Sequence, residues 1–107
     1  MSKERLQSEL ETALQTTGMP VVLDFYADWC MPCRMQATYF QQAEAALRGQ
    51  AEFYKVDIEA QPELAARFEV RSIPTIVIVR DGLQRWRSVG VADKDHITTA
   101  VLEVAAG

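Results

Sequence analysis

Hydrophobic residues in the first quarter of the chain follow two different periods. In residues 4–17 they are spaced by three and four positions, which predicts an amphipathic helix that ends at Gly18. The apolar positions of this helix are Leu6, Leu10, Ala13 and Leu14. Residues 21–27 (VVLDFYA) are instead almost continuously apolar, and this run predicts a strand that is buried on both faces.

The middle of the chain predicts a long helix followed by a second strand. Residues 31–47 show helical spacing, and Gly49 follows them as a stop signal. The buried stripe predicted for this helix comprises Met35, Tyr39, Ala43, Ala46 and Leu47. Residues 51–57 (AEFYKVD) alternate loosely between apolar and polar side chains and predict a strand.

The last part of the chain predicts a short helix, a hairpin and a final helix. The short helix begins at residues 61–63 (QPE), and residues 73–80 predict a third core strand. Asp81-Gly82 is a strong tight-turn signal, so residues 83–91 are expected to return as an antiparallel strand. Asp93 is placed to cap the C-terminal helix.

The predicted elements follow the order αβαβαββα, which places the chain in the α/β class. The strand, helix and strand across residues 21–57 are joined by a crossover that allows only parallel pairing, whereas the later hairpin is antiparallel. We therefore expect a central mixed sheet flanked by helices, in a single domain that spans residues 1–107.

Composition and charge exclude some classes of function. A chain of 107 residues that is 49% hydrophobic and 24% charged is typical of a globular protein, not a disordered one. Its net charge of −4 and the lack of a basic stripe argue against nucleic acid as a partner. The longest aliphatic run, residues 76–79, is far shorter than the roughly 20 residues of a membrane helix. With no apolar run after the N-terminal charges, we expect a cytoplasmic protein that binds no membrane.

Both cysteines of the chain lie in one short segment, residues 27–34 (ADWCMPCR). Because proline is tolerated in the first turn of a helix, Pro32 places Cys30 at the N-cap and Cys33 just inside the helix. Two thiols at this spacing can close into a disulfide with little backbone movement. Unpaired N–H groups and the helix dipole favour an anion there, so we expect Cys30 to ionise easily and attack a disulfide. Cys33, shielded behind it, would resolve the mixed disulfide.

A carboxylate, Asp24, interrupts the apolar strand that ends beside the cysteines. One interpretation is an aspartate near a strand edge or turned to water, since aspartate is seldom fully buried. The other is functional: desolvation raises the pKa of a buried carboxyl, so that a group near neutrality can accept and return the proton of Cys33. We favour the functional interpretation.

Two cysteines at this spacing can also be half of a zinc site. The remaining ligands would have to be His96, the single histidine, and a carboxylate. Trp29 before the pair and Pro32 inside it favour redox use, so we predict no metal ligand and interpret His96 as a solvated surface residue. A tryptophan beside a reactive thiol in a loop is typical of a contact surface.

These residues resemble the thioredoxin family over essentially the full length of the chain. The resemblance rests on matching order and spacing in five segments, namely residues 22–35 (VLDFYADWCMPCRM), 55–57 (KVD), 71–75 (RSIPT), 81–82 (DG) and 89–90 (VG). It implies the thioredoxin fold and a thiol-disulfide oxidoreductase that reduces protein disulfides.

The resemblance also implies roles for single residues. Cys30 would be the nucleophile and Cys33 the resolving thiol of a redox-active disulfide, and Pro74 a cis proline packed against it. Asp24 would transfer the proton, with Lys55 as its charged neighbour, although Lys55 could also be an ordinary strand-end charge. The surface that binds substrate proteins would comprise Trp29, Met31, Pro32, Ile73, Gly90 and Val91.

The resemblance further implies the electron supply. The chain has no glycine-rich cofactor motif, so we expect no bound cofactor and electrons from a separate thioredoxin reductase, either an NADPH-linked flavoprotein or a ferredoxin-linked enzyme. Disulfide-containing proteins would be the substrates, and we expect a monomer. Three residues depart from the family: Met31 replaces a glycine beside the nucleophile, Tyr26 replaces a common tryptophan, and Thr38 replaces a proline that often kinks the helix.

Two other functions fit the same residues. An oxidase or isomerase of an oxidising compartment would use the same thiols, and its reduction potential against glutathione would identify it. A redox-independent binding or chaperone module would keep its function in cells when both Cys30 and Cys33 are replaced by serine.

Overall fold

A computed structural model describes residues 3–15 and 18–107. Of these, residues 3–8 are described by their backbone alone. Within these residues the elements follow the predicted order αβαβαββα. They are α1 (Lys3–Gln15), β1 (Val21–Tyr26), α2 (Met31–Ala46), β2 (Glu52–Asp57), α3 (Pro62–Arg67), β3 (Thr75–Arg80), β4 (Leu83–Val89) and α4 (Lys94–Ala106). The predicted continuation of α1 over residues 16–17 and the side chain of Leu6 lie outside the described residues.

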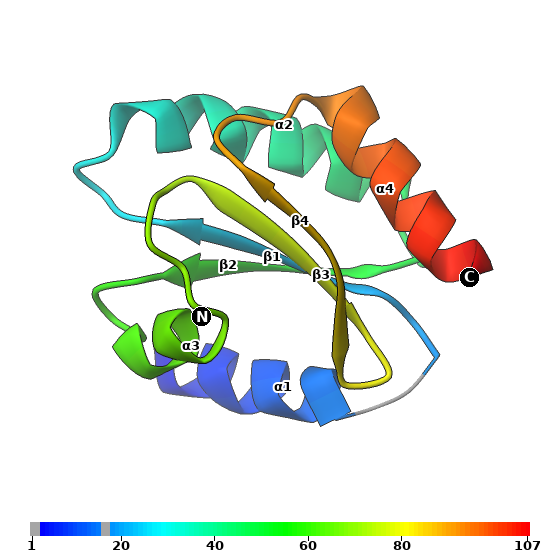
Figure 1. Cartoon of the computed structure of the whole chain (residues 1–107), viewed down its shortest axis with the longest axis horizontal. Helices are drawn as coiled ribbons and strands as arrows, with labels where there is room; N and C mark the ends of the chain where they lie inside the picture. Colours follow the sequence, from blue (N-terminus) through cyan, green and yellow to red (C-terminus); the bar gives the residue numbers. More distant parts are fainter. Residues whose placement is uncertain (1–2, 16–17) are drawn as a thin grey trace.

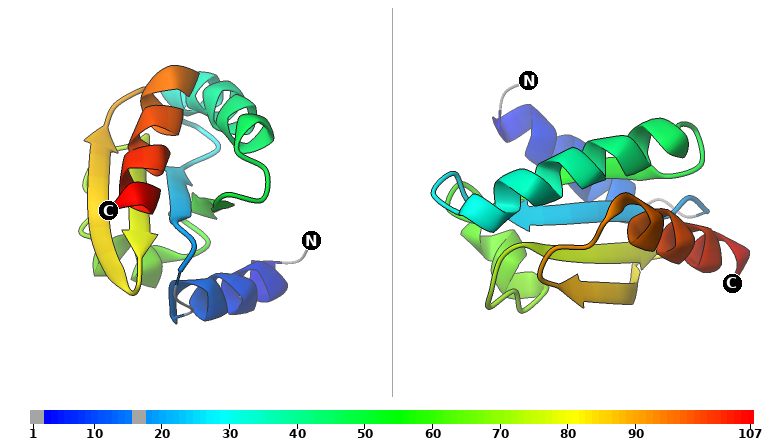
Figure 2. Two further views of the ribbon diagram at one scale, coloured as in Figure 1. Left: turned by 90° about the vertical axis from the view of Figure 1, so that its right-hand side faces the viewer. Right: turned by 90° about the horizontal axis from the view of Figure 1, so that it is seen from above.

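The sheet is mixed, as the sequence predicts, with the strand order β2-β1-β3-β4. Strand β1 pairs in parallel with β2 and antiparallel with β3, and β3 forms an antiparallel hairpin with β4. Helices α1 and α3 cover one face, and α2 and α4 cover the other (Figures 1 and 2). The result is the α/β architecture of a sheet between two helical layers.

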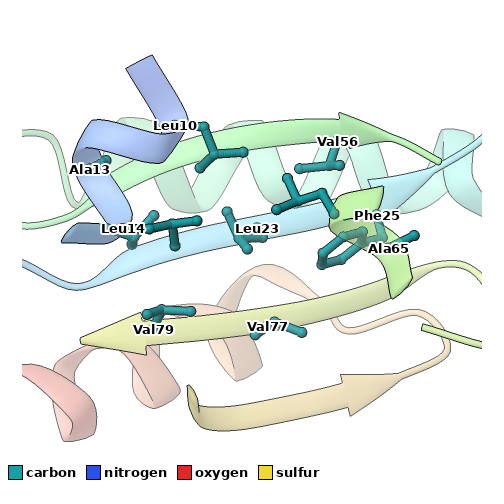
Figure 3. Packing of buried hydrophobic residues seen from close by; sticks show 11 residues of the cluster. Leu10, Ala13, Leu14, Leu23, Phe25, Val56, Ala65, Val77 and Val79 are labelled. Atoms are coloured by element: carbon teal, nitrogen blue, oxygen red, sulfur yellow. The ribbon is translucent and has the colours of Figure 1, made fainter. Parts of the chain in front are cut away.

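Each face of the sheet has its own hydrophobic core. Alternate residues of a strand point to opposite faces, so Leu23 and Val77 pack toward α1 and α3 (Figure 3), whereas Val22 and Ile78 pack toward α2 and α4. The first core includes Leu10, Ala13, Leu14, Phe25, Val56 and Leu64, and the second includes Phe40, Ala43, Leu47, Ile97, Ala100 and Val101. Strands β1 and β3 are buried on both faces because both layers cover them.

Two strand limits predicted from the sequence are wrong by two residues, and the limits at Ala27 and Ala51 are wrong by one. Strand β3 begins at Thr75 and not at Ile73, because Pro74 has no N–H to donate to a neighbouring strand. Strand β4 ends at Val89 and not at Val91. Gly90 adopts a φ of 94°, which turns the chain out of the sheet, and its N–H donates to the Pro74 carbonyl at 2.9 Å.

The buried stripe predicted for α2 is also partly wrong. The helical residues that face the core are Cys33, Gln36, Phe40 and Ala43. Met35 is 58% exposed, and Ala46 is exposed as well. The prediction followed apolar residues alone, whereas a glutamine occupies one position of the real stripe.

Among the described residues, no helix is long and apolar enough to cross a membrane.

Candidate functional site

The two cysteines lie where β1 leads into α2. After Tyr26 the chain makes one turn, closed by a hydrogen bond from the Cys30 N–H to the Ala27 carbonyl at 3.2 Å. Helix α2 then begins at Met31, with Pro32 in its first turn. This confirms the predicted helix start, because proline needs no hydrogen-bond acceptor there.

Cys30 and Cys33 form a disulfide with their Cα atoms 5.3 Å apart. Cys30 is the N-cap of α2, and its sulfur accepts the Cys33 N–H at 3.2 Å. Both residues are buried, so exposed area does not distinguish the two thiols in the oxidised form. Their surroundings do: Cys30 Sγ lies 3.9 Å from the Ile73 carbonyl, whereas Cys33 borders a cleft lined by Tyr26, Arg34 and Lys55.

Three segments that are distant in the sequence meet at the disulfide. They are the turn before α2, the segment that leads into β3, and the segment between β4 and α4, which lie at the same end of the sheet (Figures 1 and 2). The Ile73–Pro74 peptide bond is cis, as expected from the resemblance. The hydrogen bond from Gly90 to Pro74 then joins the second and third segments.

Large apolar side chains are exposed around this junction. Trp29 is 64% exposed and Met31 is 67% exposed. Val91 and Pro32 are also exposed, whereas Gly90 and Ile73 are half-buried. Four of the six residues predicted for the docking surface are thus exposed, and the other two are half-buried.

Trp29 is held in place by a residue that the sequence analysis did not identify. Its indole N–H donates to the Glu59 carboxylate at 2.9 Å. Glu59 follows β2 in a turn stabilised by Asp57, whose carboxylate accepts the N–H groups of Glu59 and Ala60. Asp57 at the end of β2 is a sequence signal for this turn, but the sequence has no signal that Glu59 pairs with Trp29.

Asp24 is fully buried, which excludes the interpretation that its side chain is turned to water. Neither of its oxygens has a hydrogen-bond partner among the described residues. Burial raises the pKa of this carboxyl to about 7, and the positive charge of Lys55 opposes that rise. Asp24 follows Val22 by two positions, so it points to the face of β1 that α2 covers.

Lys55 is the parallel-strand partner of Asp24 in the register of β1 and β2. Its ammonium nevertheless lies 4.3 Å from the centre of the Tyr26 ring, and no ion pair with Asp24 is formed in the described part of the chain. Lys55 therefore acts on the carboxyl through its charge and not through a direct contact. Tyr26, the departure from a family tryptophan, supplies the aromatic face beneath the ammonium.

Gln36 is a second residue that the sequence analysis missed. It lies one turn after Cys33 in the buried stripe of α2 and has no exposed surface. Its side-chain amide forms two hydrogen bonds with the backbone of Ala92, beyond β4. The signal in the sequence was the helical spacing Cys33, Gln36, Phe40, Ala43, which a search for apolar residues passes over.

His96 is exposed in the first turn of α4, and its ring packs edge-on against Trp86 at 5.5 Å between ring centres. Among the residues that the structure describes, no group of three or more histidine, cysteine or acidic side chains is arranged to hold a metal ion.

Comparisons with known proteins show what the whole chain is similar to. The family model for thioredoxin matches residues 2–103. Thioredoxin 1 of Chlorobaculum tepidum is 35% identical over 94 residues, covering 88% of this chain and 93% of that protein. A Staphylococcus aureus thioredoxin is 34% identical over 90 residues, covering 84% and 81%. Among solved structures, chloroplastic thioredoxin z is similar with a TM-score of 0.82, at 27% identity, covering 100% of this chain and 93% of that one. Oxidised mitochondrial thioredoxin 3 of Saccharomyces cerevisiae gives 0.79, at 26% identity, covering 91% and 89%.

Proposed function

We propose that Cys30 is the attacking thiol of this chain and that Cys33 is its resolving thiol. The chain belongs to the thioredoxin family and is a protein-disulfide reductase of the thiol-disulfide oxidoreductase class. The observation that carries this assignment is the position of Cys30 at the N-cap of α2. There its sulfur accepts the Cys33 N–H and faces the positive end of the helix dipole. Both interactions stabilise the thiolate, the form of cysteine that attacks disulfides.

The reaction consists of two exchanges. The Cys30 thiolate attacks one sulfur of a substrate disulfide, and the other substrate sulfur leaves as a thiolate that takes up a proton. Cys33 then loses its proton and attacks Cys30, which expels the first substrate sulfur as a second thiol. Two electrons pass from the dithiol to the substrate. The Cys30–Cys33 disulfide, the form present in the structure, is left behind.

Asp24 is the proposed acceptor for the Cys33 proton. A carboxyl with a pKa of about 7 can take up and return a proton near neutral pH. Asp24 is buried on the face of β1 that α2, the helix with Cys33, covers, and this burial supports the role. A cleft lined by Tyr26, Cys33 and Lys55 adjoins the resolving thiol. Lys55 would limit the rise of the Asp24 pKa.

The proposed docking surface consists of Trp29, Met31, Pro32, Ile73, Gly90 and Val91, with Pro74 shaping the segment that faces Cys30. Exposed apolar side chains around a reactive thiol favour contact with another protein. Trp29, which Glu59 orients, would lie against the substrate beside the exchanging sulfurs.

The oxidised protein must be reduced again before the next turnover. We propose that a separate thioredoxin reductase supplies these electrons, since the family implies such a partner, and that the chain binds no cofactor of its own. The net direction, from dithiol to substrate, suits a reducing compartment such as the cytoplasm.

A Cys33→Ser variant tests the assignment of the two thiols. Without the resolving thiol, the mixed disulfide through Cys30 cannot be displaced, so we expect substrate proteins to remain covalently bound until dithiothreitol releases them. The measurement is recovery of such adducts from cell lysate on non-reducing gels.

The matched control is Cys30→Ser, which should trap no adducts because the attacking thiol is absent. Adducts through Cys33 in that variant, or none through Cys30 in the Cys33→Ser protein, would overturn the assignment.

A further inference from the structure

We infer that Gln36 is a positioning residue that holds the segment after β4 against the catalytic helix, in the conformation that receives a substrate protein. The inference rests on the proposed function, because Gly90 and Val91 of this segment belong to the proposed docking surface. It assigns a positioning role to a residue outside the pair of reacting cysteines.

Two hydrogen bonds join Gln36 to a single residue of that segment. The side-chain N–H donates to the Ala92 carbonyl at 2.9 Å, and the side-chain carbonyl accepts the Ala92 N–H at 2.8 Å. Gln36 has no exposed surface, and Ala92 is almost fully buried. Water therefore cannot replace either bond, and each is worth more than its counterpart at the surface.

The segment between β4 and α4 is fixed at both ends. Gly90 donates to the Pro74 carbonyl on one side, and Asp93 begins α4 on the other. Between them Val91 is 42% exposed, and nothing in the described part of the chain pairs with its backbone groups. Gln36 thus fixes the residue next to Val91, whose backbone groups are open to hydrogen bonds from a bound peptide.

The amide is needed for more than filling space. Phe40 and Ala43, which follow Gln36 in the buried stripe of α2, are both apolar. An apolar side chain of the size of Gln36 would leave the N–H and carbonyl of Ala92 unpaired and away from water, which is strongly unfavourable. The segment would then move outward to reach solvent. The amide therefore sets the position of Ala92 relative to Cys33, one helical turn away.

This arrangement affects large and small substrates differently. A protein disulfide must lie along the segment around Val91 to reach Cys30, so it needs the segment in place before binding. A small aromatic disulfide can reach Cys30 without that contact. Loss of preorganisation should therefore slow only the reaction with proteins.

The test compares Gln36→Met with wild type and with Gln61→Met. Methionine matches glutamine in size but cannot pair with the backbone. Gln61 is also buried, lies at the start of α3 and has an amide oxygen without a partner among the described residues, so Gln61→Met makes the same chemical change outside the segment that follows β4. Each pre-reduced protein is mixed with insulin or with 5,5′-dithiobis(2-nitrobenzoic acid), and the second-order rate constants are measured.

We expect Gln36→Met to react with insulin about tenfold more slowly and with the small disulfide within about twofold of wild type. Its equilibrium constant with glutathione should stay within about twofold, since the disulfide itself is untouched. Amide hydrogen exchange at Ala92 should accelerate by at least about tenfold. Gln61→Met should show none of these changes.

The inference is overturned if Gln36→Met reduces insulin as fast as Gln61→Met does, or if it slows for both disulfides equally. Should Gln36→Met fail to fold, Gln36→Glu replaces it, because it keeps the shape and the acceptor oxygen but, when ionised, cannot donate to Ala92. Failure of the wild-type protein to reduce insulin would instead contradict the proposed function, so the two results are distinguishable.

Discussion

At the scale of a single residue, Asp24 couples the stability of the fold to its chemistry. Its carboxyl is enclosed by the core, has no hydrogen-bond partner among the described residues, and has only the charge of Lys55 to offset its burial. The pKa of about 7 reflects that imbalance, because desolvation outweighs the opposing charge. The same burial that destabilises the ionised form brings the group into the range where it can exchange protons.

Stability should therefore fall as the pH rises toward neutrality. The pKa of Asp24 is about 7 in the folded protein against a usual 3.8. The folded state binds this proton more tightly, so the full stability is present below about pH 4 and is lost as pH rises through the folded pKa, by about 4 kcal/mol in total. Asp24→Asn should lack that decrease, which urea unfolding of the oxidised proteins at pH 4.5, 6 and 8 measures.

Asp28→Asn is the matched control, since Asp28 is exposed in the turn just after β1. Its unfolding free energy should follow the wild-type pH dependence. Parallel curves for wild type and Asp24→Asn would contradict the account of Asp24.

At the scale of the element, α2 and α4 begin in the same way but with different atoms. In α2 the Cys30 sulfur accepts the N–H three residues ahead, and in α4 the Asp93 carboxylate accepts the His96 N–H at 2.9 Å. Both caps satisfy an otherwise unpaired donor at the helix N-terminus. In α2 the capping atom is also the sulfur that we propose as the attacking thiol, so the geometry that starts the helix would also stabilise its thiolate.

Removing the cap of α4 should cost stability without affecting the chemistry. Asp93→Ala is expected to lower the free energy of unfolding by about 1 kcal/mol, because the His96 N–H loses its acceptor. The reaction with a small disulfide should be unchanged. Urea unfolding and the rate with 5,5′-dithiobis(2-nitrobenzoic acid) measure the two effects.

Asp95→Ala provides the comparison, since Asp95 lies in the first turn of the same helix and its side chain is exposed. It should change the free energy of unfolding by less than about 0.5 kcal/mol. An equal loss in both variants would show that the charge near the helix end, and not the cap, is what matters.

At the scale of the whole molecule, one sheet carries two separate cores. Residues such as Leu23 pack toward α1 and α3, and residues such as Ile78 pack toward α2 and α4. Because the same strands supply both cores, neither layer can come apart without exposing the sheet. We expect the two layers to unfold together.

Leu23→Ala and Ile78→Ala test this cooperativity from opposite faces. Both side chains are fully buried, so each variant should lose about 2–5 kcal/mol. The unfolding transitions measured by tryptophan fluorescence and by circular dichroism should coincide in both. Leu102→Ala, at a 47% exposed position of α4, should have a much smaller effect. Separate transitions for the two probes would show that the layers unfold independently.

Much of the fold and part of the site could be predicted from the sequence. Hydrophobic periodicity predicted the eight elements. Asp81 and Gly82 predicted the hairpin, and both adopt positive φ angles in the structure. The predictions failed where the apolar pattern continued beyond the end of a strand, as at Ile73 and Val91. They also failed where a polar residue occupies a core position, as Gln36 does. At Ile73 the cause is the missing N–H of Pro74, whereas at Val91 and Gln36 a partner distant in the sequence overrode the local pattern.

What the sequence determined by itself is therefore local: the order of the elements, and a pair of thiols at a helix start. Proline, spacing and capping act over a few residues, so their outcome can be derived without a fold. Long-range packing is needed to bring Cys30 opposite Ile73, Glu59 to Trp29, and Lys55 over an aromatic ring. It also decided that Gln36 holds Ala92. These contacts depend on strand register and on which face of a helix turns inward, which only the simultaneous packing of distant segments sets.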